Sequence, residues 1–161
     1  MTHAPGRAER TLRVARQGHA ADDVRRFAEL AVSYCTPECK EAVALAVCEL
    51  GENLVKYGKP DGTPHAGTIG VSVEGQSVRV RAINRVGSIE DAERVAELVS
   101  KLDGAATSVQ ELYRARLHDL FTNPSQTRTQ LGLLRMAFEG GFRLSCTFEA
   151  PELQIIAERA C

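Results

Sequence analysis

Apolar positions follow two different repeats along this chain, one with the spacing of a helix and one with that of a strand. The helical repeat predicts helices over residues 22–34, 37–58, 88–102, 108–121 and 131–138. Strict alternation predicts strands over residues 11–16, 67–74, 77–84, 142–148 and 152–157. Because the strands are apolar on one face only, we expect an α/β two-layer sandwich, with helices on one face of a mixed, largely antiparallel sheet.

The most strongly patterned helix is the one predicted over residues 37–58. Thr36 is suited to cap it, Pro37 to occupy its first position and Gly58 to end it. One apolar stripe runs down the helix, formed by Val43, Val47, Leu50, Leu54 and Tyr57. This stripe is expected to face the core.

Three polar residues share another side of the same helix. Glu49 and Asn53 stand four positions apart, one above the other, with Lys56 close by. A carboxylate, a carboxamide and an ammonium group in this arrangement suit a solvated helix face as well as a binding site.

The string Glu-Leu-x-x-Asn-x-x-Lys-Tyr-Gly over residues 49–58 resembles the N-box helix of the GHKL superfamily of ATPases and kinases. The resemblance implies a Bergerat-type sandwich in which Asn53 holds magnesium on the ATP phosphates and Glu49 acts as a base. Within the superfamily the chain is most similar to the anti-sigma-factor serine kinases and the SiaB-like protein kinase group.

A glycine box follows the central hairpin in these families, of the form Asp-x-Gly-x-Gly, and its Asp binds the adenine amino group. The corresponding residues here are Asn84-Arg85-Val86-Gly87-Ser88, so Asn84 replaces the acid and Gly87 is the glycine that remains. An Asn side-chain oxygen can still accept a hydrogen bond from that amino group.

A second box, Gly-x-Gly-Leu, opens the helix after the lid in these families and cradles phosphate. It reads Gln130-Leu131-Gly132-Leu133 here, which implies that Leu131 and Gly132 contact phosphate, although a Cβ at Gln130 crowds the approach. The polar residues 122–130 before it are expected to form a flexible loop of the kind that serves as a lid.

Chain length and charge indicate the domain organisation and the kinds of partner to expect. With 161 residues and 43% apolar content, the chain suits a disordered tail over residues 1–9 and a single domain over residues 10–161. Its 20 basic and 21 acidic residues are interspersed, so no nucleic-acid partner is expected. No apolar run approaches the roughly 20 residues of a membrane span, so we expect a cytoplasmic protein without a membrane partner.

The five cysteines form an odd set without a repeated CxxC motif. Neither a disulfide framework nor a zinc site is therefore indicated. Cys35 and Cys39 flank the start of the helix over residues 37–58 and are expected to be reduced thiols.

Two functions remain open, and a third, a thiol redox or metal protein built on Cys35 and Cys39, is disfavoured for want of a third ligand or a CxxC motif. The first is an ATP- and Mg²⁺-dependent serine/threonine kinase of a bacterial-type partner-switching pathway, which phosphorylates or sequesters an anti-anti-sigma-like protein or another regulator. In it, Glu49 would accept a proton from the incoming hydroxyl, and Lys56 together with an arginine would offset phosphate charge, the arginine candidates being Arg114, Arg116 and Arg128.

The second function is a degenerate GHKL pseudoenzyme that acts as a non-catalytic protein-protein interaction module. The altered boxes at Asn84 and Gln130 favour it, whereas the carboxylate of Glu49 favours the kinase. In either case the resemblance implies pairing into a homodimer through the sheets.

Overall fold

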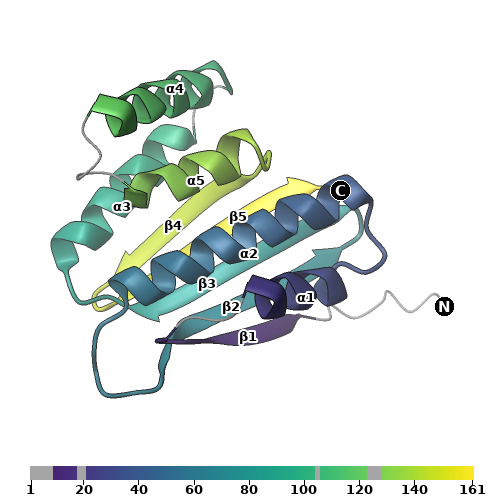
Figure 1. The fold of residues 1–161 in the computed structure, drawn as a ribbon, viewed down its shortest axis with the longest axis horizontal. Helices are drawn as coiled ribbons and strands as arrows, with labels where there is room; N and C mark the ends of the chain where they lie inside the picture. The colour runs from purple at the N-terminus through teal and green to yellow at the C-terminus, as the bar shows by residue number, and fades with distance from the viewer. Residues whose placement is uncertain (1–8, 18–20, 104–105, 123–127) are drawn as a thin grey trace.

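The computed structural model describes residues 9–17, 21–103, 106–122 and 128–161. Five strands form one sheet in the order β1-β2-β3-β5-β4, as Figure 1 shows. They are β1 (Arg10–Ala15), β2 (His65–Glu74), β3 (Ser77–Arg85), β4 (Arg143–Glu149) and β5 (Glu152–Ala160). Every neighbouring pair is antiparallel, whereas we expected a mixed, largely antiparallel sheet.

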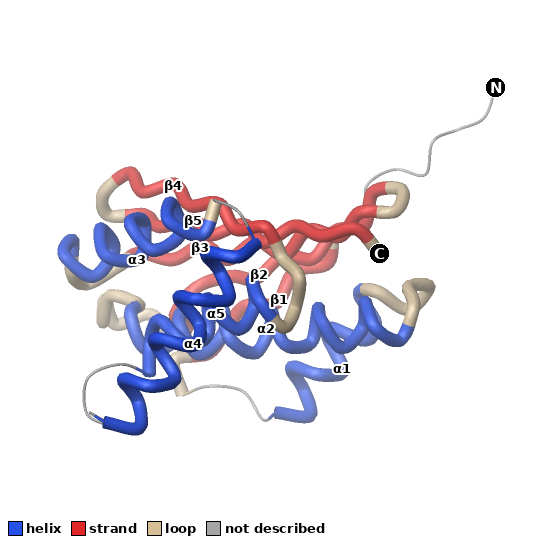
Figure 2. Tube along the Cα trace, turned by 90° about the horizontal axis from the view of Figure 1, so that it is seen from above, coloured by secondary structure: helices blue, strands red, loops and turns tan. Residues whose placement is uncertain are grey.

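Five helices form the second layer, on one face of the sheet (Figure 2). They are α1 (Ala21–Ala31), α2 (Pro37–Tyr57), α3 (Ile89–Leu102), α4 (Ala106–Thr122) and α5 (Arg128–Phe138). Helix α2 crosses the middle of the sheet, and α4 packs on α5 rather than on a strand (Figure 1). The predicted α/β two-layer fold with helices on one face is confirmed.

Helix α2 begins and ends where its caps predict. The Thr36 hydroxyl accepts a hydrogen bond from the Cys39 amide at 3.3 Å, and the Gly58 amide donates to the Leu54 carbonyl at 2.9 Å. Val43 and Leu50 are fully buried on its sheet-facing side. The capped ends and the apolar stripe together fix which side of α2 is left for polar residues.

The two predicted hairpins are both present. A two-residue turn at Gly75, where φ is +60°, joins β2 to β3, and the Ala150-Pro151 turn, with a cis peptide bond, joins β4 to β5. Buried residues alternate along β3 and face the helices. On the opposite face Arg79 pairs with Glu158, and Arg81 pairs with Glu9 at 2.8 Å.

Three predicted boundaries differ from the structure by three residues each. Helix α1 ends at Ala31 rather than at residue 34, because the Cys35 amide already donates to the Val32 carbonyl in a turn. Helix α5 begins at Arg128, three residues early, and β5 continues to Ala160. The predicted lid lies largely on residues 123–127, outside the described residues, as does most of the predicted N-terminal tail.

None of the described helices is both long enough and apolar enough to cross a membrane.

Candidate functional site

Asn53 and Asn84 line the same cavity beneath helix α2. Asn53 comes from α2 and Asn84 from the end of β3, and Leu133 of α5 closes the space between them. Asn84 is only 7% exposed. Within the described part of the chain, neither side-chain amide is hydrogen-bonded to another protein group. Because their hydrogen-bonding groups have no protein partner, this pair is suited to bind water or a ligand.

The cavity is small, with a volume of about 20 Å³. That is room for about one water molecule, whereas pockets for drug-sized ligands measure roughly 300–1,000 Å³. Leu133 of α5 and Val95 of α3 line it together with the two asparagines. A ligand larger than water can therefore reach the asparagines only if α5 or α3 moves away from α2.

Glu49 lies one turn before Asn53, against α5. Its Oε1 accepts a hydrogen bond from Nη1 of Arg135 at 2.7 Å, and a Cβ added at Gly132 would lie 2.3 Å from its Oε2. The close approach of α5 to the Glu49 carboxylate is possible because residue 132 is glycine and has no Cβ in that space. The structure thus brings together Glu49 and Gly132, two residues of predicted boxes that lie far apart in the sequence.

The environment of Glu49 changes its acidity. Burial raises the pKa of the Glu49 carboxyl, the neighbouring Arg135 opposes this, and Glu52 and Glu139 add to it. A carboxylate with a raised pKa binds a proton more readily near neutral pH, as a general base must.

A network of hydrogen bonds extends from Glu49 to α4. The Nε of Arg135 donates to Oε2 of Glu139 at 3.3 Å, and the Tyr113 hydroxyl donates to Oε1 of the same carboxylate. The hydrogen bond to Glu139 raises the pKa of Tyr113. Residues of α2, α4 and α5 are therefore coupled through one chain of polar contacts.

Glu49 is also reachable from solvent. It lines an open polar groove of about 890 Å³ formed by α1, α2 and α5. The groove carries both charges, with Arg25 and Lys40 opposite acidic residues such as Glu41 and Glu52. A polar segment of another molecule could lie in it within reach of Glu49.

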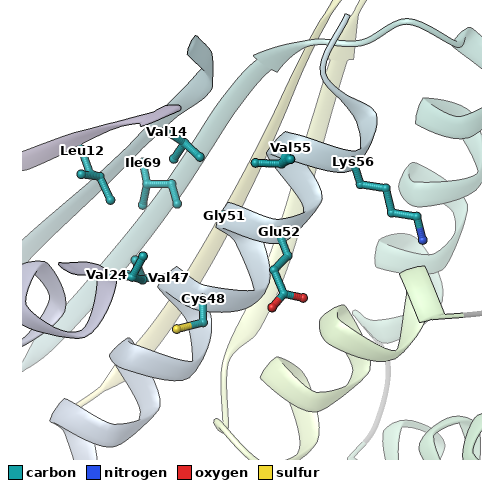
Figure 3. Close-up of a pocket in the computed structure, with 10 residues that line it drawn as sticks. All are labelled: Leu12, Val14, Val24, Val47, Cys48, Gly51, Glu52, Val55, Lys56 and Ile69. Carbon is teal, nitrogen blue, oxygen red and sulfur yellow. The ribbon is translucent and has the colours of Figure 1, made fainter. Parts of the chain in front are cut away.

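Lys56 and Gly87 do not join the cavity of Asn53 and Asn84. Lys56 lines an apolar pocket of about 310 Å³ between α2, α1 and the sheet (Figure 3). Its Nζ lies 5.6 Å from the centre of the Tyr57 ring. The Gly87 amide donates to the Tyr57 carbonyl at 3.3 Å, so the end of α2 already uses that donor.

Leu131 and Gly132 lie inside α5 rather than at its first residue. Because α5 begins at Arg128, the Gly132 amide falls within the helix's own pattern of hydrogen bonds to the carbonyl four residues back. The predicted cradle of amides at residues 131–132 therefore differs from the structure. Gln130 explains the difference, since it favours helix where glycine would interrupt one.

Arg135 is the charged residue of this site that the sequence analysis missed. In the described part of the chain, Arg116 pairs with Asp119 at 3.8 Å on α4 and neither it nor Arg114 contacts Glu49. The spacing contained a signal, because Arg135 follows Gly132 by three residues and so shares its helix face. The side chain of Arg128 is outside the described residues.

The fold and site define a two-layer α/β protein with polar residues gathered around its central helix. A chain in the crystal structure of the SiaB-SiaC complex from Pseudomonas aeruginosa has a similar fold, with a TM-score of 0.64 and 14% sequence identity. The likeness covers 96% of this chain and 89% of that one. No protein-family model matches the sequence. No curated protein matches it either.

Proposed function

We propose that this protein is an ATP- and Mg²⁺-binding regulator of the GHKL type that acts in a partner-switching pathway as a serine/threonine kinase on a protein partner. The observation that carries the proposal is the convergence of Asn53 and Asn84, from α2 and β3, on one cavity where neither amide has a protein partner. In the resemblance to the GHKL superfamily, Asn53 corresponds to the magnesium ligand and Asn84 to the residue that binds the adenine amino group.

The side chains of Asn53 and Asn84 have the chemistry to bind Mg²⁺-ATP. The cavity between them is too small for a nucleotide unless α5 moves away from α2. An Asn oxygen is a hard ligand of the kind Mg²⁺ accepts, and this ion usually takes few protein ligands because phosphates and waters complete its shell. Asn53 would hold the ion and Asn84 would accept from the adenine amino group. When bound, ATP would supply the transferable phosphoryl group, and Mg²⁺ would neutralise charge on its phosphates.

Glu49 has the position and acidity of the proton acceptor. It borders the polar groove through which a partner hydroxyl can arrive, and burial raises its pKa. Accepting that proton as the hydroxyl attacks is the step that a kinase base performs. Arg135, which pairs with Glu49, is the cation nearest the reaction and would offset phosphate charge.

A protein partner is supported by the polar groove beside Glu49 and by the structural likeness. The chain of similar fold was crystallised in a complex of two proteins. The partner would then place its hydroxyl in the groove.

A non-catalytic interaction module is the second candidate. The cavity volume of about 20 Å³ and the ion pair that already engages Glu49 favour it. In this case α2 and α5 would form a fixed surface for a protein partner, without nucleotide.

Thermal unfolding with and without millimolar Mg²⁺-ATP separates the two candidates. A ligand at about 100 times its dissociation constant adds roughly 2.7 kcal/mol, which raises the midpoint by several degrees in a domain of this size. We expect this shift in the wild type and in Glu49→Gln, and its loss in Asn53→Ala. No shift in the wild type at high ATP would reject the kinase and favour the interaction module.

A further inference from the structure

Three cysteine sulfurs meet at the start of helix α2. Cys35 lies in the turn before the helix, Cys39 in its first turn, and Cys161 directly after β5. Their Sγ atoms all lie within 4.8 Å of one another. Cys39 and Cys161 form a disulfide with a Cα separation of 5.5 Å, and Cys35 is a free, half-buried thiol. The expectation that Cys39 is a reduced thiol is therefore wrong for this structure.

Backbone contacts hold these residues in place independently of the disulfide. The Cys39 amide donates to the capping hydroxyl of Thr36, and the Cys35 amide donates to the Val32 carbonyl at 3.0 Å. The Cys161 amide donates to the Gln76 carbonyl at 2.7 Å. The three sulfurs should therefore remain neighbours when the disulfide is reduced.

The three cysteines differ in access to solvent. Cys39 is fully buried, whereas Cys35 and Cys161 are half-buried. A dissolved reagent therefore reaches Cys35 or Cys161 first, and Cys39 reacts only through one of them. A solvent-accessible thiol next to a buried one suits a two-step thiol–disulfide exchange, in which the accessible thiol reacts first.

We propose that Cys35, Cys39 and Cys161 form a redox-active three-thiol site that exchanges with low-molecular-weight disulfides. The Cys161 thiolate attacks the small disulfide, forming a mixed disulfide and releasing one small thiol. The Cys39 thiolate then attacks the Cys161 sulfur, which forms the Cys39–Cys161 bond and releases the second small thiol. Two protein thiols are oxidised, one small disulfide is reduced, and the two protein protons go to the two small thiols.

The free thiol of Cys35 gives the site a second oxidised form. Its thiolate attacks the Sγ of Cys161, the Cys35–Cys161 bond forms, and the electron pair of the broken bond leaves on Cys39, which takes up the proton. No external oxidant is consumed, because the number of disulfides is unchanged.

The disulfide anchors the helix that carries Glu49 and Asn53. The Cys39–Cys161 bond joins the first turn of α2 to the end of β5, two segments separated by 122 residues. Its formation and loss would make the anchoring of α2 depend on the surrounding thiol and disulfide concentrations. This inference does not depend on nucleotide binding.

Disulfide mapping in glutathione buffers tests the proposal. The full chain is equilibrated at several ratios of reduced to oxidised glutathione, quenched by alkylation, and mapped by peptide mass spectrometry. We expect the Cys39–Cys161 bond to appear and disappear reversibly with the ratio. In Cys39→Ser we expect a Cys35–Cys161 bond in its place, and in Cys161→Ser a Cys35–Cys39 bond.

Two other cysteines provide matched controls. Cys48 and Cys146 are free thiols that do not belong to the cluster of three sulfurs, and burial raises the pKa of both. Cys48→Ser and Cys146→Ser should therefore leave the mapped bonds unchanged. Persistently alkylated Cys39 and Cys161 in fully oxidised glutathione would overturn the proposal. Stoichiometric binding of Zn²⁺ by the reduced chain, with resistance to oxidation, would overturn it in favour of a metal site.

Discussion

The carboxylate of Glu49 is held between a glycine and an arginine of the same neighbouring helix. Gly132 leaves room for the carboxylate and Arg135 binds it, so the position of this one side chain depends on both. Every proposed step that uses Glu49 as a base therefore depends on how closely α5 approaches α2.

Gly132→Ala tests this dependence at a single residue. The new Cβ would displace the Glu49 carboxylate, which is the flexible end of a side chain, while alanine improves helix propensity by about 1 kcal/mol. We expect the unfolding free energy to change by less than about 1 kcal/mol and the rate of ATP consumption to fall at least tenfold. Unchanged ATP turnover in this variant would contradict the role given to Glu49.

The pH dependence of stability tests the environment of Glu49. Because the folded-state pKa of Glu49 is raised, its contribution to stability is complete below its unfolded pKa of about 4.3 and is lost as pH rises through the folded value. Urea unfolding should show the wild type losing stability relative to Glu49→Gln across that range. Parallel curves for the two proteins would show that the pKa of Glu49 is not raised.

At the scale of whole elements, the contact between α5 and α2 sets the size of the cavity. Leu133 is 1% exposed and lines the space shared by Asn53 and Asn84, while the adjacent Leu134 is 2% exposed and does not line it. Comparing a substitution of Leu133 with one of Leu134 therefore distinguishes the effect of enlarging the cavity from the effect of losing core packing.

Leu133→Ala should destabilise the fold by about 2–4 kcal/mol and at the same time tighten Mg²⁺-ATP binding, because it opens the cavity. Leu134→Ala should cost a similar amount without tightening binding. Calorimetric titration alongside urea unfolding measures both effects. Equal ATP affinity in the two variants would mean that Leu133 does not limit access to the asparagines.

The sequence predicted the elements better than it predicted their contacts. Helix α2 was correct at both ends, because Thr36, Pro37 and Gly58 are local signals that act within one turn. The start of α5 was missed, because the resemblance to a glycine box outweighed the helix propensity of Gln130. The small volume of the cavity was not predictable, since it depends on where α5 packs in three dimensions.

Among the site residues, too, local sequence patterns predicted some positions but not the contacts between distant segments. Spacing along one helix placed Asn53 beside Glu49, and the resemblance to a glycine box indicated Asn84. In the structure Asn53 and Asn84 line one cavity. The Cys39–Cys161 bond did not follow, because its partners are 122 residues apart and meet only in the folded chain. Arg135 was missed for a similar reason, since its partner lies on another helix.

At the scale of the whole molecule, the disulfide closes a long loop between α2 and the end of β5. Breaking such a bond typically removes about 2–4 kcal/mol of stability, or roughly 5–15 °C in the midpoint for a domain of this size. Thermal unfolding in reducing and oxidising buffer should show this difference in the wild type and none in the double variant Cys35→Ser/Cys161→Ser, which keeps only one of the three cysteines. Equal midpoints for the wild type in both buffers would show that the bond does not constrain the fold.

The most direct test of the central claim is hydrogen–deuterium exchange of the whole chain with and without Mg²⁺-ATP. The proposed site requires slower exchange in the second half of α2, around Asn53, and at the end of β3, around Asn84, together with altered exchange in α5. Protection confined to the apolar pocket between α1 and α2, or no change at saturating ATP, would contradict the nucleotide site proposed between α2, β3 and α5.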